Sequence, residues 1–172
     1  MRAIVPDVLA PGLRLVFCGT APSRASAAAR AYYAKPGNRF WPALHAAGFT
    51  PRRFQPTEYP LLLELGIGLT DLCKDHSGND DELPSGALDA ARLRQKIERY
   101  RPGAVAFTSK NAARAFLARD VAYGWQAEQV GSARLYVLPS PSGQATRFWD
   151  ERPWRALALW LRETNRVHEP GT

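Results

Sequence analysis

The 172-residue sequence has few residues of the kinds that cross-link small domains or ligate metals, with only two cysteines and three histidines. Cys18 and Cys73 are too few and too far apart for a disulfide framework or a zinc site. No apolar run reaches the roughly 18 residues that a membrane-spanning helix needs. The N-terminus MRAIVPDVLAPG carries Asp7 and two prolines, unlike a signal peptide. We therefore expect a cytoplasmic protein with reduced thiols, no membrane partner and no metal.

Negative charge is also scarce, because 16 Asp and Glu stand against 23 Lys and Arg, for a net charge of +7. An excess of this size suits a polyanionic partner, since each phosphate that is neutralised releases counterions. The alternative is a basic surface that serves solubility alone. The length and the absence of repeats or linkers predict a single domain over residues 1–172.

Short apolar runs alternate with helical patterns along the chain. The runs predict strands at Leu13–Cys18, Gly66–Leu72, Ala104–Thr108 and Leu135–Leu138. Helices are predicted at Arg39–Ala47, with Asn38 as its cap, at Leu88–Tyr100, at Asn111–Arg119 and from Pro153 onward. This alternation predicts an α/β fold with a mostly parallel sheet.

Three small polar loops follow the predicted strands. They are GTAPS at Gly19–Ser23, Ser109-Lys110, and PSPSG at Pro139–Gly143. The first lacks the second glycine and the Gly-Lys-Ser/Thr ending of a P-loop, and Gly19 stands alone where a dinucleotide fingerprint needs three glycines. Because ligands bind beyond the carboxyl ends of parallel strands, we expect the three loops to share one pocket.

Three stretches, VLAPGLRLVFCGTAPS, YAKPGNRFWPALHAAGFTP and LPSPSG, resemble the uracil-DNA glycosylase superfamily, most strongly its mismatch-specific uracil/thymine branch, over about residues 9–161. The resemblance implies a three-layer α/β/α domain acting as a monomer on DNA at the nucleoid. It also implies that a deaminated base, uracil first, is flipped from DNA and its N-glycosidic bond hydrolysed without metal or cofactor.

The resemblance also assigns site residues. The base pocket would be lined by Gly19, Thr20, Ala21, Pro22, Ser23, Tyr33 and Ser140. Tyr33 would stack on the flipped base, and Ser140 stands where the mismatch-specific branch has an asparagine. DNA would be contacted by Lys110, Ser142, Gly143, Gln144, Ala145 and Arg147, with Gln144 as the wedge that enters the gap in the duplex.

The chain departs from the family pattern at the catalytic position, where the mismatch-specific branch has an asparagine and this sequence has Ala21. Two polar residues could have taken over the role. Asn38 in PGNRFW could instead be a helix cap, and Asp71 in GIGLTDLCKD could instead form a cap or an ion pair. Lys35 replaces a histidine that is usual in the family.

Three other functions stay open. The GTAPS loop, the Tyr32-Tyr33 pair and Asp71 also match the hypoxanthine-DNA glycosylase branch, which makes hypoxanthine the second candidate base. The loss of the asparagine at Ala21 allows a protein that binds damaged or abasic DNA without cleaving it. A nucleotide-binding fold unrelated to DNA would require the PGNRFW block to be a coincidence.

Overall fold

The computed structural model describes residues 3–168 and places a five-stranded sheet at the centre of the molecule. In chain order the elements are β1 (Leu15–Gly19), α1 (Arg24–Ala29), α2 (Phe40–Ala47), the 3₁₀ segment η1 (Pro56–Leu65), β2 (Ile67–Asp71), η2 (Asp80–Glu82), α3 (Ala90–Tyr100), β3 (Ala104–Phe107), α4 (Lys110–Leu117), β4 (Gly124–Val130), β5 (Ala133–Val137), η3 (Gly143–Phe148) and α5 (Arg152–His168). The strand order is β2-β1-β3-β5-β4, and only the pairing of β4 with β5 is antiparallel.

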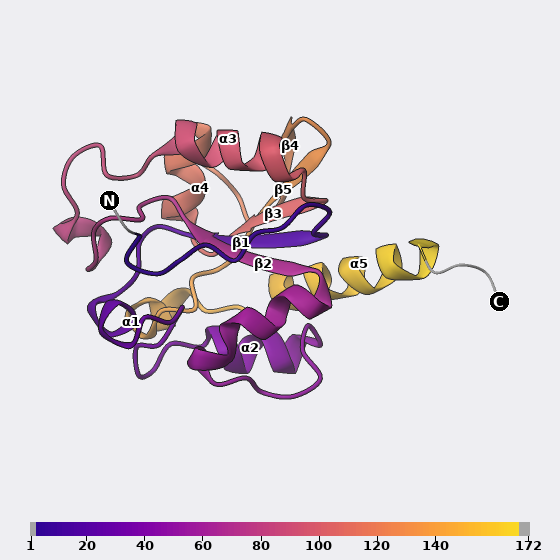
Figure 1. Ribbon diagram of the computed structural model, residues 1–172, viewed down its shortest axis with the longest axis horizontal. Helices are drawn as coiled ribbons and strands as arrows, with labels where there is room; N and C mark the ends of the chain where they lie inside the picture. The colour runs from indigo at the N-terminus through magenta and orange to yellow at the C-terminus, as the bar shows by residue number, and fades with distance from the viewer. Residues whose placement is uncertain (1–2, 169–172) are drawn as a thin grey trace.

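Helices cover both faces of this sheet, so the predicted three-layer α/β/α architecture is confirmed (Figure 1). α3 and α4 lie on one face, and α2, η1 and α5 lie on the other. β1, β2 and β3 are buried along their whole length, which is why they read as short continuous apolar runs in the sequence.

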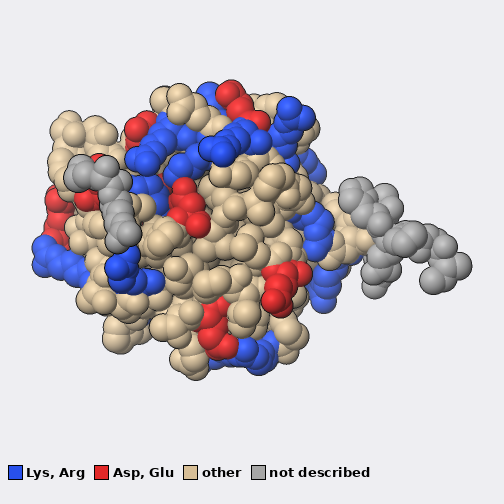
Figure 2. All heavy atoms as spheres, in the orientation of Figure 1, with Lys and Arg blue, Asp and Glu red and all other residues tan. Residues whose placement is uncertain are grey.

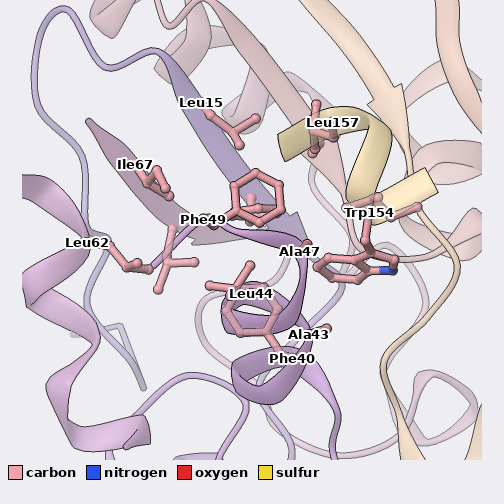
Figure 3. Close-up of a cluster of buried hydrophobic side chains, with 14 of the residues drawn as sticks. Leu15, Phe40, Ala43, Leu44, Ala47, Phe49, Leu62, Ile67, Trp154 and Leu157 are labelled. Atoms are coloured by element: carbon pink, nitrogen blue, oxygen red, sulfur yellow. The ribbon is translucent and has the colours of Figure 1, made fainter. Parts of the chain in front are cut away.

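The larger hydrophobic core lies between the sheet and α2, η1 and α5 (Figure 3). Phe40 and Leu44 of α2 pack there against Trp154 and Leu157 of α5. Phe17 of β1 lies at the centre, with its ring 5.3 Å from that of Phe40 in an edge-to-face contact. α2 is thereby fixed against the sheet, and the loop that precedes α2 is held at the strand ends.

The structure departs from the predicted elements in several places. β4 was not predicted. It is an edge strand, so most of its residues are partly or fully exposed, and its sequence contains no apolar run. α1 and η1 were also missed, since neither shows a wide apolar stripe. α2 begins at Phe40 with Arg39 at the cap position, and Asn38 instead accepts a hydrogen bond from the Phe40 N–H at 2.9 Å.

None of the helices described is both long enough and apolar enough to span a membrane. Among the side chains described, those of residues 3–165, no three from His, Cys, Asp or Glu gather in a way that could hold a metal ion.

Candidate active site

A cavity of about 680 Å³ lies beyond the carboxyl ends of the parallel strands. β1 and β2 end side by side, with Gly19 paired to Asp71, and Thr108 follows the last residue of β3. The loops after β1, β3 and β5 all line the cavity, as their sequence predicted. Its size lies within the roughly 300–1,000 Å³ of small-molecule sites, so a nucleoside-sized group can enter it.

The structure brings nearly all of the predicted site residues to this cavity. Those lining it are Gly19, Thr20, Ala21, Pro22, Ser23, Tyr33, Asn38, Asp71, Lys110, Ser140, Ser142, Gln144 and Ala145. Gly143 and Arg147 do not line it and are exposed on η3 beside it. His45, His76 and Asp75 are exposed and stand outside the lining.

Asp71 is the acid in the lining that is buried, and it lies at the cavity floor where β2 ends. Its side chain is 4% exposed. Its Oδ1 lies close to Gly19: a Cβ atom added to Gly19 would be 2.8 Å from this oxygen. Its Oδ2 has no hydrogen-bond partner among the described residues. Oδ2 is enclosed by protein, whereas Oδ1 lies next to Gly19, as does the Tyr33 hydroxyl, so Oδ1 is the oxygen that can face a ligand in the cavity.

Burial raises the pKa of Asp71 from 3.8 to about 6. The ammonium of Lys74, with a nitrogen 3.9 Å from Oδ2, acts in the opposite direction and favours the charged form. Asp7 raises the pKa again, since it is a nearby like charge, while Lys96 lowers it. At neutral pH the site therefore holds a carboxylate that is ionised but accepts a proton more readily than an exposed one.

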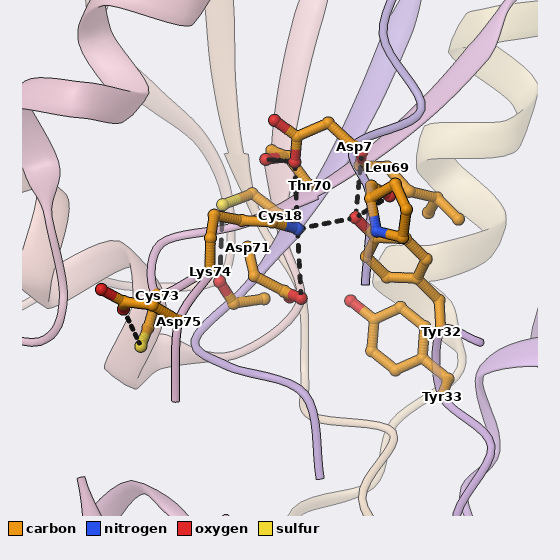
Figure 4. Close-up of polar contacts among 12 residues, drawn as sticks. Asp7, Cys18, Tyr32, Tyr33, Leu69, Thr70, Asp71, Cys73, Lys74 and Asp75 are labelled. Carbon is orange, nitrogen blue, oxygen red and sulfur yellow. Dashed lines mark hydrogen bonds and ion pairs between the residues drawn. The ribbon is translucent and has the colours of Figure 1, made fainter. Parts of the chain in front are cut away.

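Tyr33 presents an aromatic ring to the cavity and is fixed from three directions. Its ring stacks on Phe40 with centroids 3.9 Å apart, and its hydroxyl is 3.0 Å from the Thr108 hydroxyl. Its backbone adopts φ 54°, a left-handed conformation that few non-glycine residues take. Figure 4 shows its hydroxyl directed toward the side where Asp71 lies.

Asn38 is placed to serve both roles that the sequence left open, a structural role at the start of α2 and a role in the cavity. Its Oδ1 accepts a hydrogen bond from the Phe40 N–H, which closes a turn just before α2. Its side-chain NH₂ takes part in no hydrogen bond among the described residues, and the residue lines the cavity. The carbonyl oxygen thus orients the side chain, and the NH₂ group is left to donate toward a ligand.

The loop after β5 is folded by its own serines. The Ser140 hydroxyl accepts a hydrogen bond from the Ser142 N–H at 3.2 Å, and the Ser142 hydroxyl accepts one from the Gln144 N–H at 3.3 Å. These turns hold Gln144 exposed at the rim of the cavity. They leave the Ser140 hydroxyl proton free to donate.

Sequence reasoning missed two features of the rim. Asp80 of η2 accepts hydrogen bonds from Thr20 (2.6 Å) and from Asn111 in the first turn of α4 (2.9 Å), and so joins η2, the loop after β1 and α4 around the opening. Phe148 lines the cavity at the end of η3 and is 63% exposed. A phenylalanine directly before Trp149 looks like a core residue in sequence, so only the fold places it outside.

Basic side chains surround the opening. Lys35, Lys110 and Arg114 line the cavity, opposed there by the exposed acids Asp80 and Asp81. Lys110 also lies over the Tyr123 ring, 4.4 Å from its centroid. Elsewhere, Figure 2 shows Lys and Arg gathered over α3. The positive charge of the chain is therefore spread over more than one face.

The chain was compared with known families and structures. A family model described as the uracil DNA glycosylase superfamily matches residues 6–162. The chain is also similar to a solution NMR structure from Methanosarcina acetivorans that is provisionally described as a uracil DNA glycosylase. The two share 26% sequence identity with a TM-score of 0.64, over 94% of this chain and 98% of that one.

Proposed function

Because the chain belongs to the uracil DNA glycosylase superfamily, we propose that it is a monofunctional DNA glycosylase that flips a deaminated base out of DNA and hydrolyses its N-glycosidic bond. The observation that carries this proposal is the buried carboxylate of Asp71 at the floor of a cavity that also holds the ring of Tyr33. We propose further that the whole chain acts as one domain and as a monomer, since one flipped base occupies one pocket.

Bond cleavage places positive charge on the sugar and negative charge on the departing base. The C1′–N bond breaks with its electron pair going to the base, and a water oxygen then bonds to C1′. In our proposal Asp71 orients this water and stabilises the cationic sugar, since a carboxylate held in a dry pocket acts strongly on developing charge. The water proton passes to Asp71 or to solvent.

Asn38 is proposed to act on the base rather than on the water. Its unpaired amide NH₂ can donate to a carbonyl oxygen of the base, where negative charge accumulates as the bond breaks. Tyr33 would stack on the base, and stacking of this kind contributes about 1–3 kcal/mol. Ala21 carries no polar group and would only shape the pocket wall.

The rim around η3 is proposed to contact the duplex. Gln144 would enter the space left by the flipped nucleotide, with Ser142, Gly143 and Ala145 shaping the loop. The exposed ring of Phe148 lies on the same rim and would pack against an unstacked base step. Lys110 and Arg147 would neutralise phosphates on either side, which positions the strand without reading its sequence.

Uracil is our first choice of base, on the length of the match to the mismatch-specific branch and on the description of the Methanosarcina acetivorans relative. Hypoxanthine is the second candidate. The observation that favours it is Asp71 itself, which lines the cavity where the hypoxanthine branch has an aspartate. One changed hydrogen bond in the pocket is enough to alter the preference by a few kcal/mol.

The test is alkali-induced strand cleavage of labelled oligonucleotides under single-turnover conditions. The substrates carry uracil opposite G, uracil opposite A, uracil in single-stranded DNA, thymine opposite G, and hypoxanthine opposite T. Cleavage of one of them supports the proposal and names the base. If none is cleaved while abasic DNA is bound tightly, the enzyme proposal fails, and the protein is a damage-binding module, as the alanine at position 21 would allow.

A further inference from the structure

A buried charged network lies behind Asp71, on the side away from the cavity opening. The ammonium of Lys74 is its centre, in a side chain that is only 2% exposed. Its nitrogen is 3.0 Å from Asp7 Oδ1, 2.9 Å from the Tyr32 hydroxyl and 3.9 Å from Asp71 Oδ2 (Figure 4). Asp7, Tyr32 and Lys74 did not enter the assignment of site residues from the sequence.

Asp7 is held in this position by the backbone of the N-terminal segment. The segment runs beside the edge of β2, where Val8 and Leu69 exchange two hydrogen bonds of 2.9 Å. The Ile4 N–H donates to the Lys74 carbonyl at 2.8 Å. Asp7 also pairs with Lys96 of α3 at 2.6 Å, and its Oδ1 accepts from the Thr70 hydroxyl at 2.7 Å.

The ammonium of Lys74 lies closer to the carboxylate of Asp7 than to that of Asp71. The shorter contact is with Asp7, and the longer one leaves Asp71 Oδ2 without a hydrogen bond. A carboxylate in a close ion pair is a poor acceptor for a reacting proton, and a buried one without any counter-charge would be neutral. Because Lys74 pairs closely with Asp7 and lies 3.9 Å from Asp71, the Asp71 carboxylate has a nearby counter-charge but is not held in a close ion pair.

We propose that Lys74, anchored by Asp7, is a positioning residue that keeps the Asp71 carboxylate ionised and directed into the cavity. This inference rests on the proposed function, because it gives Asp71 the role of acting on water. Lys74 itself lies outside the cavity lining and does not touch the substrate.

The groups that face Asp71 come from several elements. Lys74 follows β2, Asp7 comes from the N-terminal segment and Lys96 from α3. Cys18 of β1 and the tyrosine pair before α2 also lie near it, with thiol and phenol pKa values that burial raises, so they stay neutral at pH 7. The charge that acts on Asp71 at neutral pH therefore comes from Lys74, Asp7 and Lys96.

This arrangement predicts shifts of opposite sign for two substitutions in one ion pair. Lys74→Met removes the cation, so Asp71 should hold its proton to higher pH, by about one unit or more. Asp7→Asn leaves Lys74 with Asp71 as its acidic partner, so Asp71 should ionise at lower pH. If Lys74 and Asp7 served only the stability of the fold, both variants would be less stable, but the pH at which Asp71 ionises would not move in opposite directions.

The experiment combines two readouts on the parent and both variants. The ¹³C chemical shift of the Asp71 carboxyl carbon is titrated by NMR, and single-turnover cleavage of the preferred oligonucleotide is measured from pH 5 to pH 9. We expect the acidic limb of the rate profile to move up for Lys74→Met, with activity recovered at high pH, and to move down for Asp7→Asn. Arg119→Met, which breaks the exposed pair with Glu128, is the control and should move neither.

Each result bears on one proposal. An Asp71 titration unchanged in both variants overturns the role of Lys74, as does a titration that moves while the rate profile does not. If Lys74→Met does not fold, Lys96→Met takes its place, with a smaller upward shift expected. If the parent cleaves no base, the proposed function fails, and the NMR titration still decides whether Lys74 controls Asp71.

Discussion

Replacing Asp71 with asparagine separates what the carboxylate contributes to the reaction from what it does to the stability of the fold. Burial raises its pKa from 3.8 to about 6. The native state therefore holds this proton more tightly than the unfolded chain does. The stabilisation from the bound proton is fully present below pH 3.8 and is lost as the pH rises through 6.

The shift of about two pKa units corresponds to roughly 3 kcal/mol between acidic and neutral pH, of which roughly 2 kcal/mol falls between pH 4 and pH 7. An asparagine does not titrate. The free energy of unfolding of Asp71→Asn, relative to that of the parent, should therefore rise by about 2 kcal/mol from pH 4 to pH 7. Lys74 keeps Asp7 at 3.0 Å, so the substitution does not leave a buried cation unpaired.

Urea unfolding of the parent and of Asp71→Asn at both pH values measures this difference, and comparing the two pH values cancels any effect of the substitution that does not depend on pH. Single-turnover cleavage at pH 7 should fall by about 10²–10⁴-fold, the usual contribution of an acid or base group. Asp75→Asn, at a neighbouring exposed position, is the control and should change neither quantity.

Two results would refute this reasoning. If the stability difference between Asp71→Asn and the parent is the same at pH 4 and pH 7, the buried carboxyl does not titrate as burial requires. If Asp71→Asn cleaves DNA within a factor of about ten of the parent, the group that acts on water is elsewhere.

Three further predictions concern the cavity and its rim. Gly19→Ala should reduce cleavage by about 10²-fold without unfolding the protein, because the new Cβ would be 2.8 Å from Asp71 Oδ1 and the carboxyl must move; circular dichroism beside the cleavage assay checks this. Asn38→Ala should lose about 1 kcal/mol of stability with the hydrogen bond to the Phe40 N–H and at least about tenfold in rate, and a rate equal to the parent's would leave Asn38 only this structural role. Phe148→Ala should weaken duplex binding by about 1–3 kcal/mol in fluorescence anisotropy, whereas Leu159→Ala, also exposed, should leave it unchanged; equal effects would mean that the ring makes no specific contact.

Most of the sheet could be predicted from the sequence because β1, β2, β3 and β5 are short and almost wholly buried, so each contains a run of apolar residues. β4 could not, since its residues face partly outward and its only partner is β5. The convergence of the three loops was predictable for a geometric reason: parallel strands end at the same edge of a sheet.

By itself, the sequence determined where four of the five strands and the three polar loops lie along the chain, the basic charge, and the presence of Asn38, Tyr33 and Asp71 near strand ends and turns. Local patterns carry this information because buried strands and helices space their apolar residues regularly along the sequence, and turns between them are rich in small polar residues. The tertiary structure decided which of these groups share a cavity, and it alone joined Asp7 to Lys74. Those two residues are far apart in the chain, and a charge pair made through space has no period or spacing by which a sequence could reveal it.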